Sequence, residues 1–384
     1  MREGGRGRER GPGGEGLREG SSDELELRFG PQHPAIQGVL VLRLRVDGER
    51  IVECRPVIGH LHRGLEKLFE TQPFAANLPL TDHLDLAAPV TGNLAYAGAV
   101  ERLFGIEAPP RARFLRTLFA ELQRIASHLL WLGTHAADAG AIPPFRAALR
   151  ERDRVLDLWE GYLAGWPGES GLRPGGLSHD LPEGWSGQCR EFLAGFPAAL
   201  DGCEGFLTES RLWKKRMVGL GVLRAEAAVD LGVTGPALRA SGVAWDLRRA
   251  RPCEAWGEVD FDVPVGRNGD SYDRYRVRIE EMRQAARIAV QCLDRLPDGP
   301  VLADLPPELE APRDAEAYHA VEGPRGEIGF YLVGGGAAEP WRCHPRAPSL
   351  FNLQALPEIC RGERVGDLVA LIGSLDVALG EADR

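Results

Sequence analysis

Lysine is almost absent from this sequence. Its 384 residues include only Lys67, Lys214 and Lys215, so arginine carries nearly all of the positive charge. A GC-rich genome explains this bias most simply. The alternative is that arginine serves buried or interfacial ion pairs, because its planar fork suits carboxylates. The formal net charge of −10 at pH 7 argues against nucleic-acid binding by the chain as a whole.

Paired cysteines are also lacking. The seven cysteines are scattered, and none belongs to a C-x-x-C pair. This spacing excludes a zinc ribbon, an iron–sulfur ligand set and a thioredoxin-like motif. We therefore predict that the chain binds no metal of its own, and that its cysteines are mostly small buried apolar residues.

Long apolar runs are missing as well. No uncharged run approaches the ~18 residues that span a bilayer. The stretch LVALIGSL at 368–375 is far too short, and the N-terminus is rich in Gly, Arg and Glu, unlike a signal peptide. These absences predict a cytoplasmic protein, unless a partner ties it to a membrane.

The residues that are present predict an α+β fold, with strands, a long helical middle and then strands again. Residues 1–24 lack apolar periodicity and predict a disordered tail, whereas 25–384 predict a single domain. Alternation on both sides of Asp47-Gly48 indicates a β-hairpin over 39–57. We expect helices at 59–70, 109–138, 143–165, 186–207, 273–296 and 365–375, strands within 319–336, and a helix opening within 347–362.

The segment 109–138 carries the clearest helical signal. Prolines bracket it, and Glu121, Arg124 and His128 follow one another at i, i+3 and i+7. This spacing suits a salt-bridged structural line and leaves open a functional buried polar line. An apolar seam in alternating steps of three and four runs beside it, at Leu115, Leu118, Leu122, Ile125, Leu129 and Leu132.

No self-contained catalytic set is visible. The sequence has no nucleophile elbow, phosphate-binding loop or H-E-x-x-H motif. The stretch FGPQHPAIQGV at 29–39 places one imidazole, His33, between two prolines and four residues before the amide of Gln37. The loop is either a proton-handling site or the entry to a sheet.

Many long blocks resemble the D subunit of NADH–quinone oxidoreductase, the respiratory complex I. They run in order from about Phe29 to the C-terminus and are highly specific. The blocks are GPQHPAIQGVL, GHLHRGLEK, PPRARFLRTLFAELQRIASHLLWLGTHAADAGA, LRPGG, DLGVTGPALRASGVAWDLR, DFDVPVGRNGDSYDRYRVRIEEMRQ, PRGEIGFYLV and RAPSLFNLQALPE.

The resemblance implies the fold of the nickel–iron hydrogenase large subunit, with a central bundle of long helices flanked by N- and C-terminal β elements. The RGLE frame, Arg63 to Glu66, is kept without the metal-binding cysteines, so no nickel is implied. The chain is expected in the peripheral arm, on the cytoplasmic side of the inner membrane. There it would help form the quinone-reduction pocket and couple electron transfer from NADH to proton translocation.

The resemblance also places the cofactors on other chains. FMN, NADH and the iron–sulfur clusters would bind partner subunits, and quinone would be a substrate of the whole complex. The expected partners are the subunit with the terminal iron–sulfur cluster, a chain similar to the C subunit and the membrane-arm subunit with the quinone channel. The chain alone is expected to supply no complete active site.

The sequence departs from the family pattern at the candidate quinone pocket. His33 and Asp138 are kept, but Gln37 stands where the family has a second His that approaches a quinone carbonyl and pairs with that Asp. Leu86 replaces a Tyr whose hydroxyl reaches the headgroup, and His83 replaces an Arg near the terminal cluster.

These departures bear on function because quinone reduction takes up two protons. Gln37 donates a hydrogen bond but no proton, and Leu86 donates neither. The family's His-His pair before LRPGG is also replaced, by Gly168 and Glu169. Two functions stay open. One is a working member of the family with an altered pocket. The other is a divergent paralogue without quinone chemistry, with a structural or assembly role or serving a hydrogenase-like membrane complex.

Overall fold

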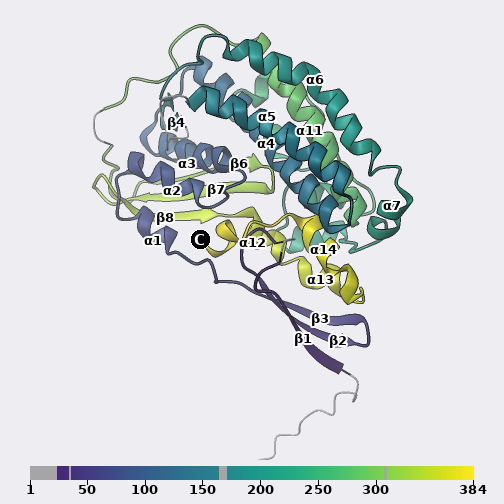
Figure 1. The fold of residues 1–384 in the computed structure, drawn as a ribbon. Helices are drawn as coiled ribbons and strands as arrows, with labels where there is room; N and C mark the ends of the chain where they lie inside the picture. Colours follow the sequence, from purple (N-terminus) through teal and green to yellow (C-terminus); the bar gives the residue numbers. More distant parts are fainter. Residues whose placement is uncertain (1–23, 34–35, 164–170, 307–308) are drawn as a thin grey trace, which may run out of the picture.

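Long helices form the body of the fold, and small antiparallel sheets are formed by the N- and C-terminal parts of the chain (Figure 1). The computed structural model describes residues 24–384 apart from 34–35, 164–170 and 307–308. The expected α+β organisation is confirmed. The long helices are α3 (Pro89–Phe104), α4 (Pro110–Asp138), α5 (Ile142–Leu163), α6 (Trp185–Gly205) and α11 (Ser271–Asp294).

Within the described ranges, the strands form sheets with their sequence neighbours, in the orders β1-β2-β3, β4-β5 and β6-β7-β8. The expected hairpin is β2–β3, and Gly48 supplies the positive φ of 57° that its turn needs. The strands are β1 (Glu24–Phe29), β2 (Val41–Asp47), β3 (Arg50–Val57), β4 (Leu172–Arg173), β5 (Gly176–Leu177), β6 (Glu316–Gly323), β7 (Gly326–Gly334) and β8 (Pro340–Arg346).

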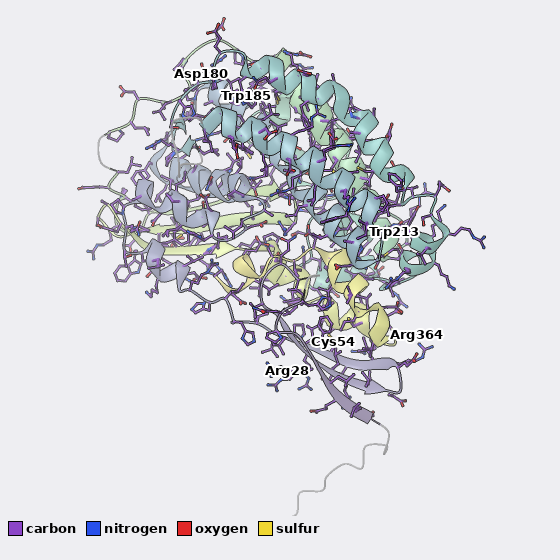
Figure 2. All side chains as sticks on the ribbon, viewed as in Figure 1. Arg28, Cys54, Asp180, Trp185, Trp213 and Arg364 are labelled. Atoms are coloured by element: carbon purple, nitrogen blue, oxygen red, sulfur yellow. The ribbon has the colours of Figure 1, made fainter. Side chains whose placement is uncertain are left out.

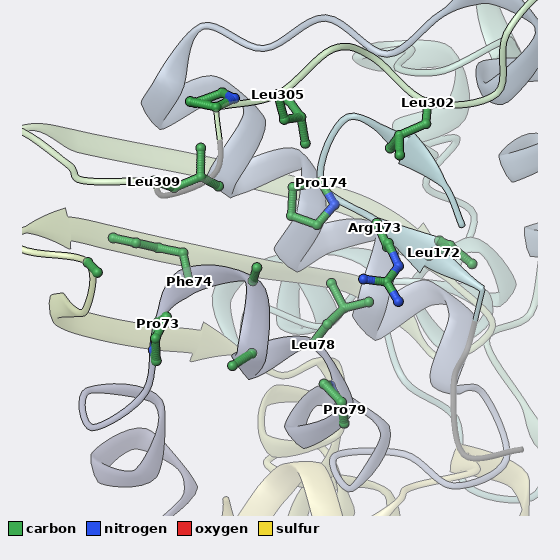
Figure 3. Close-up of a pocket in the computed structure, with 14 residues that line it drawn as sticks. Pro73, Phe74, Leu78, Pro79, Leu172, Arg173, Pro174, Leu302, Leu305 and Leu309 are labelled. Carbon is green, nitrogen blue, oxygen red and sulfur yellow. The ribbon is translucent and has the colours of Figure 1, made fainter. Parts of the chain in front are cut away.

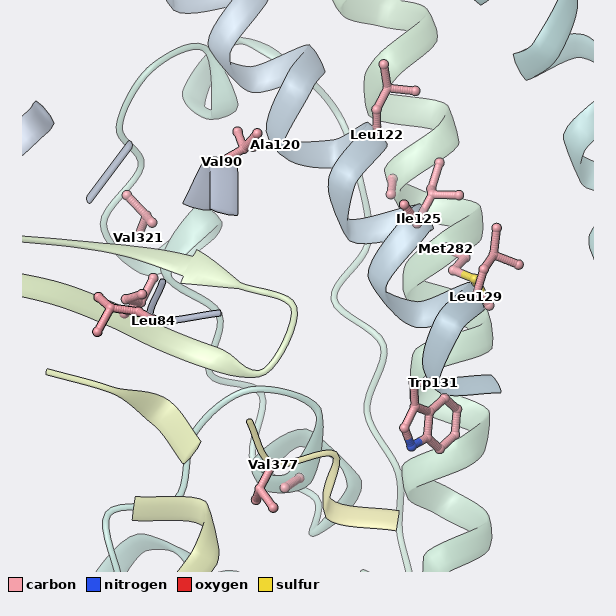
Figure 4. Packing of buried hydrophobic residues seen from close by; sticks show 14 of the residues in the cluster. Leu84, Val90, Ala120, Leu122, Ile125, Leu129, Trp131, Met282, Val321 and Val377 are labelled. Atoms are coloured by element: carbon pink, nitrogen blue, oxygen red, sulfur yellow. The ribbon is translucent and has the colours of Figure 1, made fainter. Parts of the chain in front are cut away.

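The central helix is α4, which packs against α5 and α11. Every residue of the apolar seam predicted on it is buried. Figure 4 shows Leu122, Ile125 and Leu129 of α4 beside Met282 of α11. The seam therefore belongs to the core of this chain and not to a partner surface.

The C-terminal sheet packs under α3 and presents a hairpin tip to the interior. Arg325 occupies this tip, between β6 and β7. Gly326 has a φ of 134°, and a Cβ there would collide with Thr234. The close approach that glycine permits lets the tip enter the core and carry Arg325 with it.

Short helices complete the fold, and within the described residues no helix combines the length and apolarity needed to cross a bilayer. Gly59 and Gly64 have positive φ, and the helix expected at 59–70 begins only at Leu65. The short helices are α1 (Leu65–Phe69), α2 (Leu78–Asp82), α7 (Arg211–Met217), α8 (Ala225–Asp230), α9 (Pro236–Ala240), α10 (Leu247–Ala250), α12 (Pro348–Leu353), α13 (Leu356–Cys360), α14 (Leu368–Leu375) and α15 (Leu379–Asp383), with 3₁₀ turns η1 (Phe74–Asn77), η2 (Trp256–Glu258) and η3 (Val365–Asp367).

The remaining expected helices agree with the structure to within a few residues. Those at 109–138, 143–165, 186–207 and 273–296 are confirmed as α4, α5, α6 and α11. The tail predicted over 1–24 lies outside the described residues, except that Glu24 already begins β1.

Candidate functional site

Three segments that are distant in the sequence meet at the candidate site. They are the loop before β2, the turn after α2 and the link between α14 and α15. Gln37 in the loop forms a parallel β-bridge with Ala378, and its carbonyl accepts a hydrogen bond from Leu379 N at 3.0 Å. Arg63 donates to the carbonyl oxygens of His83 at 2.8 Å and Gly380 at 3.0 Å. These hydrogen bonds fix the three segments side by side.

One buried guanidinium links the predicted Gln37 to the residue beside the predicted Leu86. Arg325 Nη2 donates to Gln37 Oε1 at 2.7 Å, and Arg325 Nη1 donates to Asp85, the residue before Leu86. Asp376 Oδ1 lies 3.4 Å from Arg325 Nη2 and accepts from Gln37 Nε2 at 3.3 Å. The amide of Gln37 is therefore oriented by a cation on one side and a carboxylate on the other.

Carboxylates outnumber the cations in this cluster. Asp85, Asp376 and Glu381 face Arg325. In the described part of the chain, only one other guanidinium lies within 4.0 Å of any of these carboxylates, that of Arg278, whose Nε is 4.0 Å from Asp376 Oδ2. Glu381 is 1% exposed and accepts from Ser349 N at 2.9 Å, with no cation at ion-pair distance among the described residues. Burial and the negative charge of Asp85 raise the pKa of Glu381 to about 8, so it holds a proton at neutral pH.

Gln37 and Asp138 line the same small cavity, of about 30 Å³, which also touches Asp376 and His135. A cavity of this size holds roughly one water molecule. The described contacts include no hydrogen bond between Gln37 and Asp138, since the Gln37 side chain is engaged by Arg325 and Asp376. Burial raises the pKa of Asp138, against the opposing effect of nearby His33.

The other predicted pocket residues lie at the surface of this region. Leu86 is 77% exposed, although Leu84 and Asp85 beside it are buried. His83 is exposed, and His33 lies against the ring of Phe29 at a centroid distance of 4.7 Å. An apolar side chain held at the surface beside a buried charge cluster is available to a ligand or a partner subunit.

The polar line predicted on α4 is part of a larger buried network. Arg124 Nε donates to Glu121 Oε2 at 3.1 Å. His128 Nε2 bonds Glu281 Oε2 of α11 at 3.0 Å, so its partner lies outside the predicted line. All of these side chains are fully buried. Although burial alone would raise it, Arg239 and His128 hold the pKa of Glu281 well below its ordinary value.

Arginines from α9 and α10 complete this network. Arg239 donates to Glu281 and Glu322, both at 2.7 Å. Arg248 donates to Glu121 at 3.0 Å and Asp246 at 2.7 Å. Each carboxylate has a guanidinium partner, an arrangement that favours the structural interpretation of the line.

His135 is a buried histidine beside the candidate site. It lies between the rings of Trp131 and Trp213, at centroid distances of 5.3 and 5.4 Å. Neither ring nitrogen has a hydrogen-bond partner within the described residues. Burial and the charge of Arg278 lower the pKa of His135 to about 3, so the folded protein keeps it neutral.

We expect His135→Phe to remove part of the acid sensitivity of the fold. The unfolded chain binds a proton near pH 6.5 and the folded one only near pH 3, so stability is lost as pH falls through this window. When the pH falls from 6.5 to about 5.5, His135 lowers the free energy of unfolding by ~1 kcal/mol, and the Phe variant should not show this loss. Urea denaturation at both pH values measures the difference. Exposed His60→Phe is the control, and equal pH slopes for wild type and His135→Phe would contradict the prediction.

A larger cavity, of about 720 Å³, contains none of the predicted site residues. Figure 3 shows its walls, which are apolar apart from Arg173. Phe74, Leu78, Leu172 and Leu305 are among the lining residues. Because no described acid or base other than this arginine lines it, the cavity offers no proton chemistry, and its size does not make it the site.

Sequence reasoning missed the residues that organise the site: Arg325, Asp85, Asp376 and Glu381. Arg325 lies within one of the blocks that carried the family resemblance, but no local pattern linked it to Gln37. Gly168 and Glu169 lie outside the described residues. Across the described ranges, no three His, Cys, Asp or Glu side chains gather closely enough to hold a metal ion.

Comparison with known proteins identifies the family of the chain. A family model described as "Respiratory-chain NADH dehydrogenase, 49 Kd subunit" matches residues 138–315 and 307–384. The D subunit of NADH-quinone oxidoreductase from Geotalea uraniireducens is 45% identical over 95% of this chain and 100% of the relative. The D 2 subunit of the same enzyme is 45% identical in Solibacter usitatus (94% and 98% covered) and 42% in Thermodesulfovibrio yellowstonii (95% and 98%). The chain therefore belongs to the family of respiratory-chain NADH dehydrogenase 49 kDa subunits, the D subunits of complex I.

Proposed function

We propose that the chain is a peripheral-arm subunit whose Gln37–Arg325–Asp85 cluster forms part of a quinone-reduction pocket. The observation that carries the proposal is the shared guanidinium. Arg325 holds both Gln37 and Asp85, the neighbour of Leu86. Gln37 and the residue next to Leu86 therefore share one cation although they come from distant parts of the chain, and this supports a common role at the quinone headgroup.

In the proposed pocket, Gln37 positions the headgroup and Leu86 supplies an apolar wall. Neither side chain delivers a proton. The protons would come from groups behind them: Glu381, which is protonated at neutral pH, and Asp138, whose pKa is raised. Both carboxyl groups lie close to residues that contact Gln37, and this proximity supports a proton supply from the protein side.

We place the redox cofactors on partner subunits, as family membership suggests. FMN, NADH and the iron–sulfur clusters bind there, and this chain contributes the wall of the pocket next to the terminal cluster. The complex holds the chain at the cytoplasmic side of the inner membrane. Its contacts are the cluster-bearing subunit, a chain similar to the C subunit and the membrane-arm subunit with the quinone channel, and electron transfer there drives proton translocation.

Restoring the family residues tests the pocket. We expect the double change Gln37→His, Leu86→Tyr to raise quinone reductase activity by about tenfold, because it adds two proton-donating groups at one headgroup. Each single change should give less, and the two effects should not add. Asp138→Asn should matter little in the present protein, but it should weaken the Gln37→His variant, whose imidazole it would orient.

The measurement is NADH-driven quinone reduction in membranes, corrected for the amount of assembled complex. Leu212→Tyr is the matched control, because Leu212 is also exposed, at 63%, but lies in α7, away from the cluster. If the double variant assembles normally and its activity stays flat or falls, the proposed roles of these two positions are wrong.

A divergent paralogue without quinone chemistry is the second candidate function. It is favoured by one observation, that neither Gln37 nor Leu86 supplies a proton where the resemblance expects one. In that case the parent complex would show no inhibitor-sensitive quinone reduction, and the tagged chain would still bring other subunits with it.

A further inference from the structure

Three arginines stand directly opposite one another across the N-terminal sheet. The strand register pairs Arg28 with Arg43, and Arg43 with Arg55. All three side chains are exposed, on the face opposite the buried Leu42 and Leu44. Like charges at directly opposed positions destabilise a sheet, so this arginine row has no evident role in holding the fold together.

The neighbouring row of the same face is balanced. Glu26, Arg45 and Glu53 are in register, and Arg45 also lies 3.3 Å from a carboxylate oxygen of Glu24 and 3.4 Å from one of Glu53. In the arginine row, by contrast, only Arg55 has an ion pair, with Glu53. Neither of the other two arginines has a carboxylate within 4.0 Å in the described part of the chain. Among the residues that the structure describes, positive charge is therefore left uncompensated at one defined place.

The arginine row lines a hollow of about 540 Å³. Val57 and the buried Val41 form the next row of the register and line the same hollow, together with His60 and the two carboxylates of the balanced row, Glu26 and Glu53. The sheet projects from the helical body, and Figure 2 labels Arg28 on this projecting part (Figures 1 and 2). The hollow is the size of a ligand or peptide site, much larger than one inorganic anion.

We propose that the arginine row (Arg28, Arg43 and Arg55) is the docking site of an acidic segment of another protein of the complex. A run of carboxylates fits a row of guanidinium groups, because each can be bound bidentately. The adjoining Val57, which is half-buried, suits an apolar residue within such a segment. Family membership supplies the setting, a multi-subunit assembly, and the proposal is independent of quinone chemistry.

The scarcity of lysine permits a direct test. The substitution Arg43→Lys places a new amine in the row. It is made in the tagged chain, and the complex is purified from its own cell. A carbodiimide then joins that amine to any carboxylate in contact with it, forming an amide while the reagent takes up the lost water as a urea. Lys67 lies 2.6 Å from Glu70, and Lys214 lies 2.9 Å from Glu209, so these pairs are internal positive controls.

Arg45→Lys is the matched control variant, on the same strand and face. Its amine should couple within the chain, to Glu24 or Glu53. The amine at position 43 should instead couple to an Asp or Glu of another subunit, identified by mass spectrometry. The proposal would be overturned if the amine at position 43 coupled only within this chain, or did not couple at all, while the lysine controls reacted.

Charge reversal gives an independent readout. Arg28→Glu with Arg43→Glu should lower recovery of the crosslinked partner by about tenfold in a salt wash, because a repulsive pair replaces each attractive one. Arg224→Glu with Arg251→Glu makes the same change in net charge at exposed positions elsewhere and should leave recovery unchanged. Equal recovery from both double variants contradicts an acidic docking segment. So does loss of co-purifying anionic phospholipid alone, which would assign the row to lipid phosphate.

Discussion

Replacing Arg325 with methionine should lower the free energy of unfolding by about 3–5 kcal/mol, the usual cost of leaving buried charge without its partner. The Arg325 side chain is 1% exposed and is the ion-pair partner of both Asp85 and Asp376. Methionine fills much of the same volume but leaves these carboxylates facing one another. Chemical denaturation at neutral pH measures the loss.

Two further variants separate charge from packing at this position. Arg325→Lys keeps the cation but loses the fork that reaches Gln37 and Asp85 together, so it should cost less than methionine does. Arg342→Met removes a 38% exposed arginine that pairs with Glu66 and Glu70, and should cost below ~1 kcal/mol. The Arg325→Met variant should recover stability on acidification, when its carboxylates become neutral. A loss below ~1 kcal/mol, without such recovery, would contradict the role assigned to Arg325.

Glu381→Gln should flatten the pH dependence of stability between pH 4.5 and about 8. The folded carboxyl keeps its proton up to about pH 8, whereas the unfolded one releases it near its ordinary 4.5. The stability that goes with this proton is fully present below pH 4.5 and is lost as pH rises toward about 8, by up to ~1.4 kcal/mol per pH unit. Glutamine keeps the shape and cannot ionise, so the variant should become the more stable protein at alkaline pH.

Denaturation curves at several pH values across this window provide the test. Exposed Glu358→Gln is the matched control and should keep the slope of the wild type. Activity of the assembled complex gives a second readout. If Glu381 supplies protons to the quinone, its Gln variant should be slower than the parent below about pH 8, where only the parent carries that proton. Parallel stability curves for the parent and Glu381→Gln would mean that the carboxyl is ionised in the folded protein.

The sequence predicted the elements that have one apolar face. α4 carries its seam at helical spacing, and the β2–β3 hairpin has alternation around an Asp-Gly turn, so both could be recognised locally. α3 was missed because residues 90–101 are buried all around, which leaves no polar face to reveal the period. β8 was missed because it begins with Pro340 and contains Pro345, a composition that argues against a strand.

The candidate site was predictable only in part, for a different reason. The family resemblance supplied Gln37, Leu86 and Asp138, but the residue that connects Gln37 to Asp85, the neighbour of Leu86, is Arg325, 288 positions from Gln37. Nothing in the spacing of a single sequence links two such positions. The excess of buried carboxylates could not be predicted either, because an Asp or Glu judged from its residue type alone is expected at the surface.

The bonds between the loop before β2 and the link after α14 also determine when the site can form during synthesis of the chain. Gln37 bonds to Asp376, which the ribosome adds 339 residues later. At a synthesis rate of about 5–20 residues per second, that interval is on the order of 20–70 seconds. α4 and α11 emerge during this wait, while Gln37 lacks its bonds to Asp376 and Ala378. A ribosome that stalls shortly before Asp376 therefore leaves a chain whose long helices are complete and whose site lacks the carboxylates of Asp376 and Glu381.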